Sequence, residues 1–257
     1  MDAHLREILD LFFRWLHLFA GILWVGNSMI WNWLDRNLEP GDPADKNHQG
    51  TIWMVHSGSF YEMRKLQLEP SQMPKVLHWF WIQATTTWAS GIALLILVYY
   101  MGGQAALIDT SVSTLTQGQA IGLSVGLVVG AWLVYDLLWR TLGKTAPQFV
   151  AFLCVLGLVG IIYGLTHVFN GKAAFLHVGA MLGTLMVSNV WNHILPSQRE
   201  LVRLTQAGKL QELALSYRAK QRSTHNNYMT FPVLFTMISG HFPTTYGGPN
   251  AWLVLCI

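Results

Sequence analysis

Apolar residues are grouped along this chain into runs of roughly 20 positions, separated by polar and charged stretches. A run of that length forms a helix that crosses the roughly 30 Å hydrocarbon core of a bilayer. The pattern predicts spans at 11–34, 78–100, 119–139, 148–168, 174–195 and 227–241, and a seventh that begins at 251. We expect this last span to continue beyond residue 257, where the sequence stops inside it. The predicted fold is an all-α, polytopic transmembrane helix bundle that forms one integral membrane domain over 1–257.

Lysine and arginine concentrate in three of the segments that join the predicted spans. Thirteen of the sixteen basic residues lie in 35–77, 140–147 and 196–226. Because cytoplasmic loops carry an excess of basic residues, we expect loops 35–77 and 196–226 in the cytoplasm and the N-terminus in the periplasm. Within the last loop, leucines alternate with basic residues over 198–222. That pattern fits a helix on the membrane surface as well as it fits a solvated connector.

The composition supports a membrane protein and removes several other classes. Only 11% of the residues are charged and 52% are apolar, whereas soluble domains carry about 25% charged residues. The net charge of +3 gives no reason to expect a nucleic-acid partner. Cys154 and Cys256 form neither a disulfide framework nor a CxxCH motif, so we expect no covalent haem in this chain. Any metal must therefore be held mostly by histidine.

Glycines spaced four residues apart occur in two of the predicted spans. Gly122, Gly126 and Gly130 lie in the third span, and Gly179 and Gly183 lie in the fifth. Small residues at this spacing allow helix backbones to approach closely in lipid. We interpret both sets as helix-packing positions.

Four histidines are predicted at one level near the periplasmic ends of the spans. They are His17, His167, His177 and His241. Neutral imidazole is a good iron ligand, and a flat apolar macrocycle fits between helices, so these four are candidate haem iron ligands for a b-type haem. Trp24 shares a helical face with His17 and would line the same site. The alternative is that each histidine only hydrogen-bonds a neighbouring helix.

A second group of histidines is predicted near the cytoplasmic ends of the spans and in the loops. Such a layer fits a substrate, a second haem or a quinone, and equally fits a structural role at the interface. Glu62 is the loop carboxylate that stands out as a possible acid or base beside aromatic residues. The candidate catalytic residues are His56, Glu62, His78 and His225, and the layer also includes His48 and His193.

Seven short strings occur in an order that resembles a known family. They are RWLH (14–17), WLD (33–35), VHSGSFY (55–61), LHWF (77–80), YGLTH (163–167), FLHVGAM (175–181) and QRSTHNNY (221–228). Together they resemble the membrane domain of the bacterial membrane-bound urate oxidases, also called urate hydroxylases. The resemblance extends over nearly the whole chain.

The resemblance implies a domain of eight helices in the bacterial inner membrane, followed by a cytochrome c domain that takes electrons from urate. Urate would bind the membrane domain and lose two electrons, water would supply the added oxygen, and a b-type haem would relay the electrons outward. Trp81 and Gln83 stand where the family pattern has a lysine and a glutamate. The runner-up interpretation is a non-catalytic accessory or electron-relay subunit of a larger respiratory or photosynthetic membrane complex.

Overall fold

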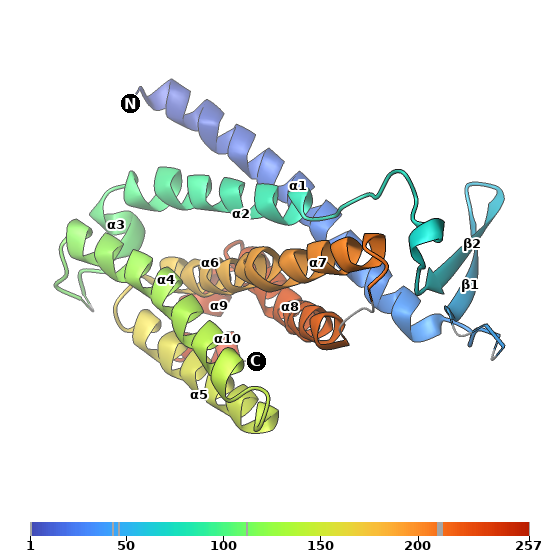
Figure 1. Ribbon diagram of the computed structural model, residues 1–257. Helices are drawn as coiled ribbons and strands as arrows, with labels where there is room; N and C mark the ends of the chain where they lie inside the picture. Colours follow the sequence, from blue (N-terminus) through green and yellow to red (C-terminus); the bar gives the residue numbers. More distant parts are fainter. Residues whose placement is uncertain (1, 43, 46, 112, 210–212, 257) are drawn as a thin grey trace.

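The computed structural model describes residues 2–42, 44–45, 47–111, 113–209 and 213–256. Within these ranges the chain is mainly helical and contains one pair of strands (Figure 1). η1 is a short 3-10 helix, whereas η2 and η3 are π-helical turns. The elements follow in the order α1 (Ala3–Asn37), β1 (His48–His56), β2 (Ser59–Leu66), η1 (Pro70–Gln72), α2 (Ile82–Leu94), η2 (Leu95–Tyr100), α3 (Gln104–Leu107), α4 (Gln117–Thr141), α5 (Pro147–Thr166), α6 (Gly171–Asn189), η3 (Val190–Ile194), α7 (Leu195–Gln206), α8 (Leu213–Ser239), α9 (Pro243–Tyr246) and α10 (Ala251–Cys256).

Five helical segments are long and apolar enough to cross a membrane. They are α1, α2 with η2, α4, α5 and the continuous helix formed by α6, η3 and α7. Each coincides with one of the first five predicted spans, which are thus confirmed as membrane-spanning candidates. Among the described residues, α8 and α10 do not meet the same criterion, so the sixth and seventh spans stay predictions. Ile257, beyond which the seventh span is expected to continue, lies outside the described residues.

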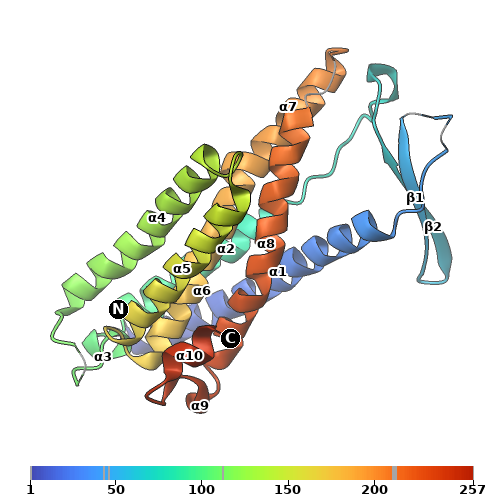
Figure 2. The same cartoon turned by 90° about the horizontal axis from the view of Figure 1, so that it is seen from below.

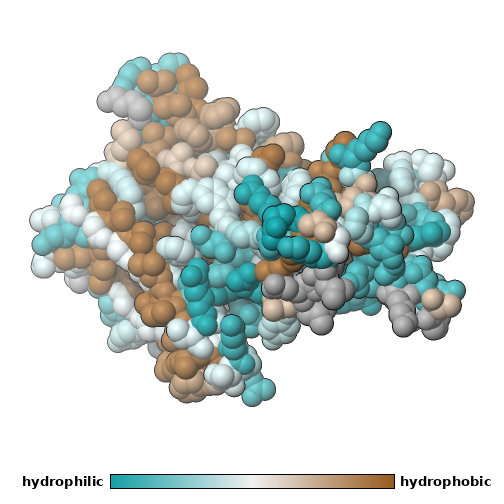
Figure 3. Space-filling view, in the orientation of Figure 1, coloured by the Kyte–Doolittle hydropathy of each residue, from teal (hydrophilic) through white to brown (hydrophobic). Residues whose placement is uncertain are grey.

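The helix α6 forms the centre of the bundle, and α2, α4, α5 and α8 pack around it (Figure 2). In the long helix Gly171–Gln206, which α6 begins, about 72% of an 18-residue apolar stretch is buried, against 6% for the corresponding stretch of α1, which lies along α2 at the edge of the bundle. Figure 3 shows hydrophobic residues over α1, α4 and α5, and hydrophilic residues gathered at the end that carries α7 and the strands. This distribution is compatible with a helix bundle that crosses a membrane.

The N-termini of α4, α5 and α6 have residues that commonly begin helices. The Thr116 hydroxyl accepts a hydrogen bond from the Gln119 backbone N–H at 3.3 Å and so caps α4. The Asn170 side chain does the same for α6 by accepting from Ala173 N–H at 2.8 Å. Pro147 occupies the first position of α5, where its missing N–H costs no helical hydrogen bond. These caps set where the helices begin.

The strands β1 and β2 form an antiparallel hairpin inside the segment predicted as a cytoplasmic loop. Its two-residue turn has positive φ at Ser57 (48°) and Gly58 (77°), the backbone that tight hairpins require. Lys65 Nζ contacts Asp35 Oδ1 at 2.7 Å, which ties the hairpin to the end of α1. The all-α expectation is therefore wrong for this segment, although it holds for the bundle.

The segment 198–222 does not form a single helix on the membrane surface. Most of its first part belongs to α7, which continues the line of α6, and most of its second part begins α8, which packs back against α7 (Figure 2). The two helices form an extension of the bundle at its α7 end. Leu210, one of the leucines in the predicted pattern, lies outside the described residues.

The two glycine patterns have different roles. A Cβ at Gly179 would lie 2.4 Å from the Thr236 hydroxyl and 2.8 Å from Met237 Cε, because α6 and α8 meet closely there. At Gly122, Gly126 and Gly130, by contrast, a Cβ would meet nothing within 4 Å. The packing interpretation is confirmed for Gly179, whereas the three glycines of α4 face no other element among the described residues.

Leucine at Gly179 should destabilise the bundle, whereas leucine at Gly183 should not. Overpacking a close contact costs about 1–3 kcal/mol, and a Cβ at Gly183 meets nothing within 4 Å. We expect the Gly179→Leu protein to have a lower thermal unfolding midpoint in detergent than Gly183→Leu, which keeps the wild-type value. Equal midpoints for the two variants would show that the α6–α8 contact is looser than described.

Candidate functional site

A cluster of polar and charged side chains is buried between α4, α8 and the helix formed by α6 and η3. Ionisable groups within membrane-spanning helices are costly and are functional candidates by default. Six of the seven members are less than 9% exposed, and two of these, Arg222 and Asn189, are 2% and 1% exposed. We call this group the buried polar cluster; its members are Tyr135, Asp136, Asn189, His193, Arg222, His225 and Asn226.

Asp136 is the centre of charge in the cluster. Its Oδ1 accepts hydrogen bonds from His193 Nε2 at 2.5 Å and from Arg222 Nη2 at 3.1 Å. Its Oδ2 contacts Arg140 Nε at 2.6 Å, one helical turn further along α4. A buried carboxylate needs opposite charge and hydrogen bonds to offset its lost hydration. Asp136 obtains both from three helical segments, and it thereby joins α4 to η3 and α8.

Two asparagine amides connect the charged groups to the aromatic part of the cluster. Arg222 Nη1 donates to Asn189 Oδ1 at 3.3 Å, and Asn189 Nδ2 donates to Asn226 Oδ1 at 2.9 Å and to the Tyr135 oxygen at 3.1 Å. Asn226 Nδ2 in turn donates to the Met186 carbonyl at 3.0 Å. Both hydrogens of the Asn189 amide are used, so the direction of each bond in this chain is fixed.

Tyr135 and His225 form the end of this series of hydrogen bonds. The Tyr135 oxygen accepts from Asn189 and lies 2.7 Å from His225 Nδ1, and we assign the Tyr135 proton to this second bond. Since Nδ1 is then the acceptor, a neutral His225 carries its proton on Nε2. The imidazole lies against the Trp139 ring with centroids 4.1 Å apart, and the Arg222 guanidinium stands 5.1 Å from the Tyr135 ring centroid. The tautomer and orientation of His225 are thus set by its neighbours.

A hollow of about 260 Å³ adjoins His225 on α8. Lys220, which carries a positive charge, and Gln221, which carries an amide, are among its lining residues. The remaining lining residues are Tyr217 and Thr224. A planar anion with ring N–H and carbonyl groups would find a cation, hydrogen-bonding side chains and an aromatic ring there.

The π-helical turn η3 places side chains on two sides of the central helix. Trp191 Nε1 donates to Thr85 Oγ1 on α2 at 2.9 Å, whereas His193 reaches Asp136 on α4. π-Helical turns within α-helices occur frequently at functional sites. Here the turn connects the buried polar cluster to the opposite, tryptophan-rich side of the helix.

Among the four predicted haem ligands, His177 has the most unusual surroundings. It is fully buried, and its Nδ1–H donates to the Ala173 carbonyl at 2.7 Å. Its Nε2 has no hydrogen-bond partner among the described residues. The ring lies between Phe169 and Tyr99, with centroids 4.7 and 6.0 Å away. A histidine whose Nδ1–H is held by a carbonyl presents an Nε2 lone pair, which is the usual arrangement of a metal-ligating imidazole.

The other three candidate ligands lie elsewhere in the bundle. The His17 Nδ1–H donates to the Thr87 carbonyl at 2.8 Å, and the ring lies against Gly91 of α2. Gly91 and Tyr99 are eight residues apart, about 12 Å along a helix, so His17 and His177 contact α2 at different levels. His167 and His241 are exposed near the α9 end. Among the described residues, no three histidine, cysteine or acidic side chains are grouped to hold a metal ion.

Of the four candidate catalytic residues, only His225 belongs to the buried polar cluster. His56 is exposed at the hairpin turn, and Glu62 forms an exposed ion pair with Arg64 at 2.8 Å. His78 is exposed in the linker that precedes α2. The structure does not bring these three to the cluster. Trp24, predicted beside a haem, instead packs against apolar residues of α2, α6 and η3.

Sequence reasoning missed Asp136, Asn189 and Arg222. A signal for Asp136 was available, since it is the one acidic residue within the predicted span 119–139. Arg222 and Asn189 gave no such signal, because a basic residue near a span end and an amide within a span are common. Their importance follows only from the contacts that α8 and α6 make with α4.

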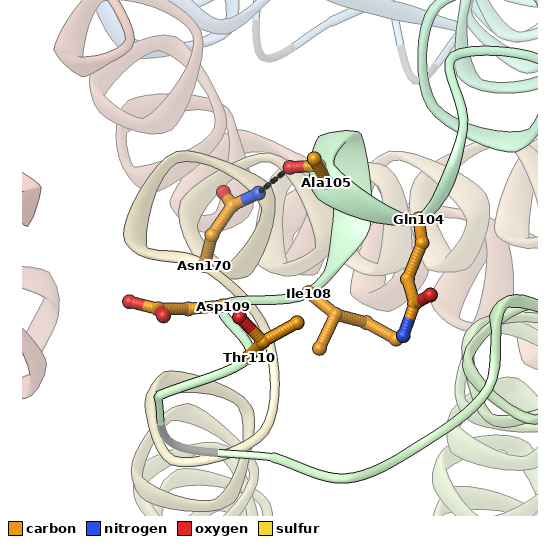
Figure 4. Close-up of a pocket in the computed structure, with 6 residues that line it drawn as sticks. All are labelled: Gln104, Ala105, Ile108, Asp109, Thr110 and Asn170. Carbon is orange, nitrogen blue, oxygen red and sulfur yellow. Dashed lines mark hydrogen bonds between the residues drawn. The ribbon is translucent and has the colours of Figure 1, made fainter.

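A second hollow, of about 410 Å³, lies at the opposite end of the bundle (Figure 4). Asn170 Nδ2 donates to the Ala105 carbonyl at 3.1 Å across its upper rim. Hydrogen bonds from Ser111 lower the pKa of Asp109, whose carboxylate points away from Gln104 in Figure 4. The Asn170 amide thus holds the α3 loop in place. We favour the buried polar cluster, and not this second hollow, as the functional site.

Comparison with known proteins gives one match. No curated protein and no solved structure matches the chain. The family described as "Urate oxidase N-terminal" matches residues 3–257, which is nearly the full sequence. The chain therefore belongs to the urate oxidase N-terminal family.

Proposed function

We propose that this protein is the membrane domain of a urate-oxidising enzyme that passes electrons toward cytochrome c. Its family supports this, and the observation that carries it is the hydrogen-bond chain from Asp136 to His225 beside a hollow. The α7 end holds the basic segments, so we place this end, and the entry of urate, on the cytoplasmic side of a bacterial inner membrane. The acceptor is a cytochrome c domain or subunit on the opposite side, alone or within a larger membrane complex.

Urate is planar and carries one negative charge at neutral pH. In the hollow, the Lys220 ammonium balances that charge, the Gln221 amide bonds ring groups, and His225 Nε2–H donates to the anion. Hydrogen bonds to a charged partner contribute about 1.5–3 kcal/mol each. Tyr135 keeps the proton of His225 on Nε2, so the imidazole is oriented for this donation before substrate arrives. Asp136 and Arg222 act one step further away by holding Asn189 and Tyr135.

Oxidation of urate needs a group that accepts electrons from it. A b-type haem, when bound, supplies a one-electron relay between a two-electron donor and a one-electron acceptor. The donor chemistry of His177 fits an iron ligand, because its Nδ1–H is held by the Ala173 carbonyl and its Nε2 has no partner among the described residues. Phe169 and Tyr99 enclose the ring and would have to move aside for a macrocycle. We therefore propose His177 as the first ligand to test.

A visible difference spectrum tests this proposal. We expect purified protein reduced with dithionite to show the bands of a low-spin b-type haem, and urate to produce the same bands. The His177→Gly variant should lose them, and added imidazole should restore them by occupying the space of the missing ring. Bands that persist in His177→Gly would exclude His177 as a ligand. A protein without haem bands under any reductant would contradict the cofactor assignment.

A further inference from the structure

The hairpin formed by β1 and β2 has an apolar face next to its turn. Val55 lies opposite Phe60 in the strand register, and Trp53 lies opposite Glu62. Residues that lie opposite each other in a pair of strands project from the same face, as do residues two apart in one strand. The side chains of Trp53, Val55 and Phe60 therefore share one face, where they are 62%, 70% and 78% exposed. We call these three residues the tip patch.

The opposite face of the hairpin is covered by the rest of the chain. Ile52 is 7% exposed, and its cross-strand partner Met63 is half-buried. The tip patch is thus on the free side of the hairpin. Exposed apolar groups of this kind mark an interaction with another protein or with a membrane, so the surroundings of the patch decide between the two.

Two contacts hold the base of the hairpin at the end of α1. Lys65 Nζ contacts Asp35 Oδ1 at 2.7 Å, and Glu39 and Thr51 exchange two backbone hydrogen bonds of 2.8 and 3.0 Å. Asp35 comes two residues before the last residue of α1. Both ribbon views show the hairpin beside this end of α1 and apart from α4, α5 and α8 (Figures 1 and 2). The hairpin is therefore attached where a candidate membrane-spanning helix ends.

Two tryptophans near the same end of α1 indicate the level of the membrane surface. Trp31 and Trp33 are 46% and 48% exposed, and tryptophan is enriched at the boundary between lipid and water. Trp31 and Asp35 are four residues apart, which is about 6 Å along a helix. From Lys65 to Phe60 the strand β2 advances about 17 Å. The tip patch is therefore within reach of the bilayer surface.

The charge of the segment decides how the patch can bind a bilayer. Five basic residues accompany six acidic residues over 35–77, and Arg64, on the same face as the tip patch, is paired with Glu62 at 2.8 Å. The segment thus offers no excess of positive charge to anionic headgroups. The outer edges of a two-stranded sheet exclude deep insertion, because unpaired backbone groups are costly in hydrocarbon. What remains is shallow insertion of the apolar side chains.

We propose that the tip patch inserts into the lipid–water interface beside α1, and that it does so equally in neutral and in anionic lipid. Aromatic rings suit this depth, and the indole of Trp53 can keep its N–H among the polar headgroups while its ring contacts acyl chains. The hairpin then attaches the segment between α1 and α2 to the membrane at a second place. This inference concerns the hairpin alone and does not depend on the proposed activity.

Collisions of a spin label with oxygen and with a nickel chelate test this placement in nanodiscs that hold one copy of the full chain. Oxygen concentrates in lipid, the chelate stays in water, and burial in protein excludes both. The label is attached at Ser57→Cys in the turn, with Cys154→Ala and Cys256→Ala as background, so the tip patch stays intact. We expect this label to collide mainly with oxygen. A label at Gln67→Cys, exposed at the other end of the hairpin, should collide mainly with the chelate.

Two serine variants separate the tip patch from the hairpin as a whole. Phe60→Ser should shift the label at Ser57→Cys toward collision with the chelate. Tyr61→Ser removes a 48% exposed ring from the opposite face and should leave the label unchanged. Both side chains are exposed, so neither substitution opens a cavity.

The lipid and the reading with the intact patch complete the test. Exchanging phosphatidylcholine for phosphatidylglycerol should not change the collisions of the label at Ser57→Cys. Collision mainly with the chelate would overturn the proposal, and rare collision with both reagents would overturn it in favour of a protein contact. Equal shifts in Phe60→Ser and Tyr61→Ser, or a reading that follows the lipid charge, would also contradict it.

Discussion

The Asp136→Leu protein should be much less stable than the wild type. Removing this carboxylate leaves the Arg222 guanidinium, whose side chain is 3% exposed, without its opposite charge inside the bundle. Breaking a buried ion pair by removing one partner costs about 3–5 kcal/mol. We expect a large fall in the temperature at which the detergent-solubilised protein loses its monodisperse chromatographic peak.

Two further variants serve as controls for this prediction. Replacing both Asp136 and Arg222 with leucine should restore much of the stability, since an apolar pair leaves no uncompensated charge. Glu200→Leu breaks an exposed pair with Arg203 on α7 and should change the unfolding temperature little. If Asp136→Leu and Glu200→Leu behaved alike, Asp136 would not hold the cluster together in the way described.

The largest effect on activity is expected at His225. Phenylalanine keeps the contact with the Trp139 ring but removes the Nε2–H that is proposed to bind urate. Loss of a hydrogen bond to a charged substrate, together with loss of a proton-carrying group, should lower kcat/KM for urate by about 10²-fold or more. Turnover is measured as loss of urate absorbance with a soluble one-electron acceptor in excess. The unfolding temperature should fall only moderately, because phenylalanine leaves the buried Tyr135 hydroxyl without its acceptor, at a cost of about 1–3 kcal/mol.

The control for this variant is Tyr228→Phe, since Tyr228 is exposed on the same helix, one turn away. It should retain wild-type turnover. The same assay on His56→Phe and His78→Phe examines two candidates from the sequence that lie apart from the cluster. Unchanged turnover in His225→Phe would remove this residue from the site. A severe loss at His56 would instead show that the hairpin approaches the substrate.

The five candidate membrane-spanning helices could be predicted because a run of about 20 apolar residues is the feature that a membrane-crossing helix requires. The hairpin could not be predicted, since the strands His48–His56 and Ser59–Leu66 mix exposed aromatic and polar residues without a clear two-residue period. The extension formed by α7 and α8 was also missed. The alternation of leucines and basic residues there fitted a surface helix and a solvated connector equally well. The packing of α7 and α8 against each other, which sets their direction, is not visible in that pattern.

For the site, too, single conspicuous residues could be predicted from the sequence, whereas contacts between distant residues could not. His225 and His177 are candidates from the sequence because histidine near the end of a span is conspicuous. The structure places His225 in the buried polar cluster and leaves His177 Nε2 without a partner among the described residues, and the roles of both stay predictions. The links between Asp136, Arg222 and Asn189 join residues 33 to 86 positions apart. Such contacts depend on which faces of three helices meet, and a pattern of hydropathy in one chain does not contain that information.

The most direct test of the proposed activity is anaerobic oxidation of urate by the purified protein in water enriched with oxygen-18. With an acceptor such as cytochrome c, the account predicts consumption of urate, transfer of two electrons per urate, and one heavy oxygen atom in the product. This result would show that the membrane domain oxidises urate with oxygen taken from water. Absence of urate consumption by a folded protein with an available acceptor would contradict the proposed function.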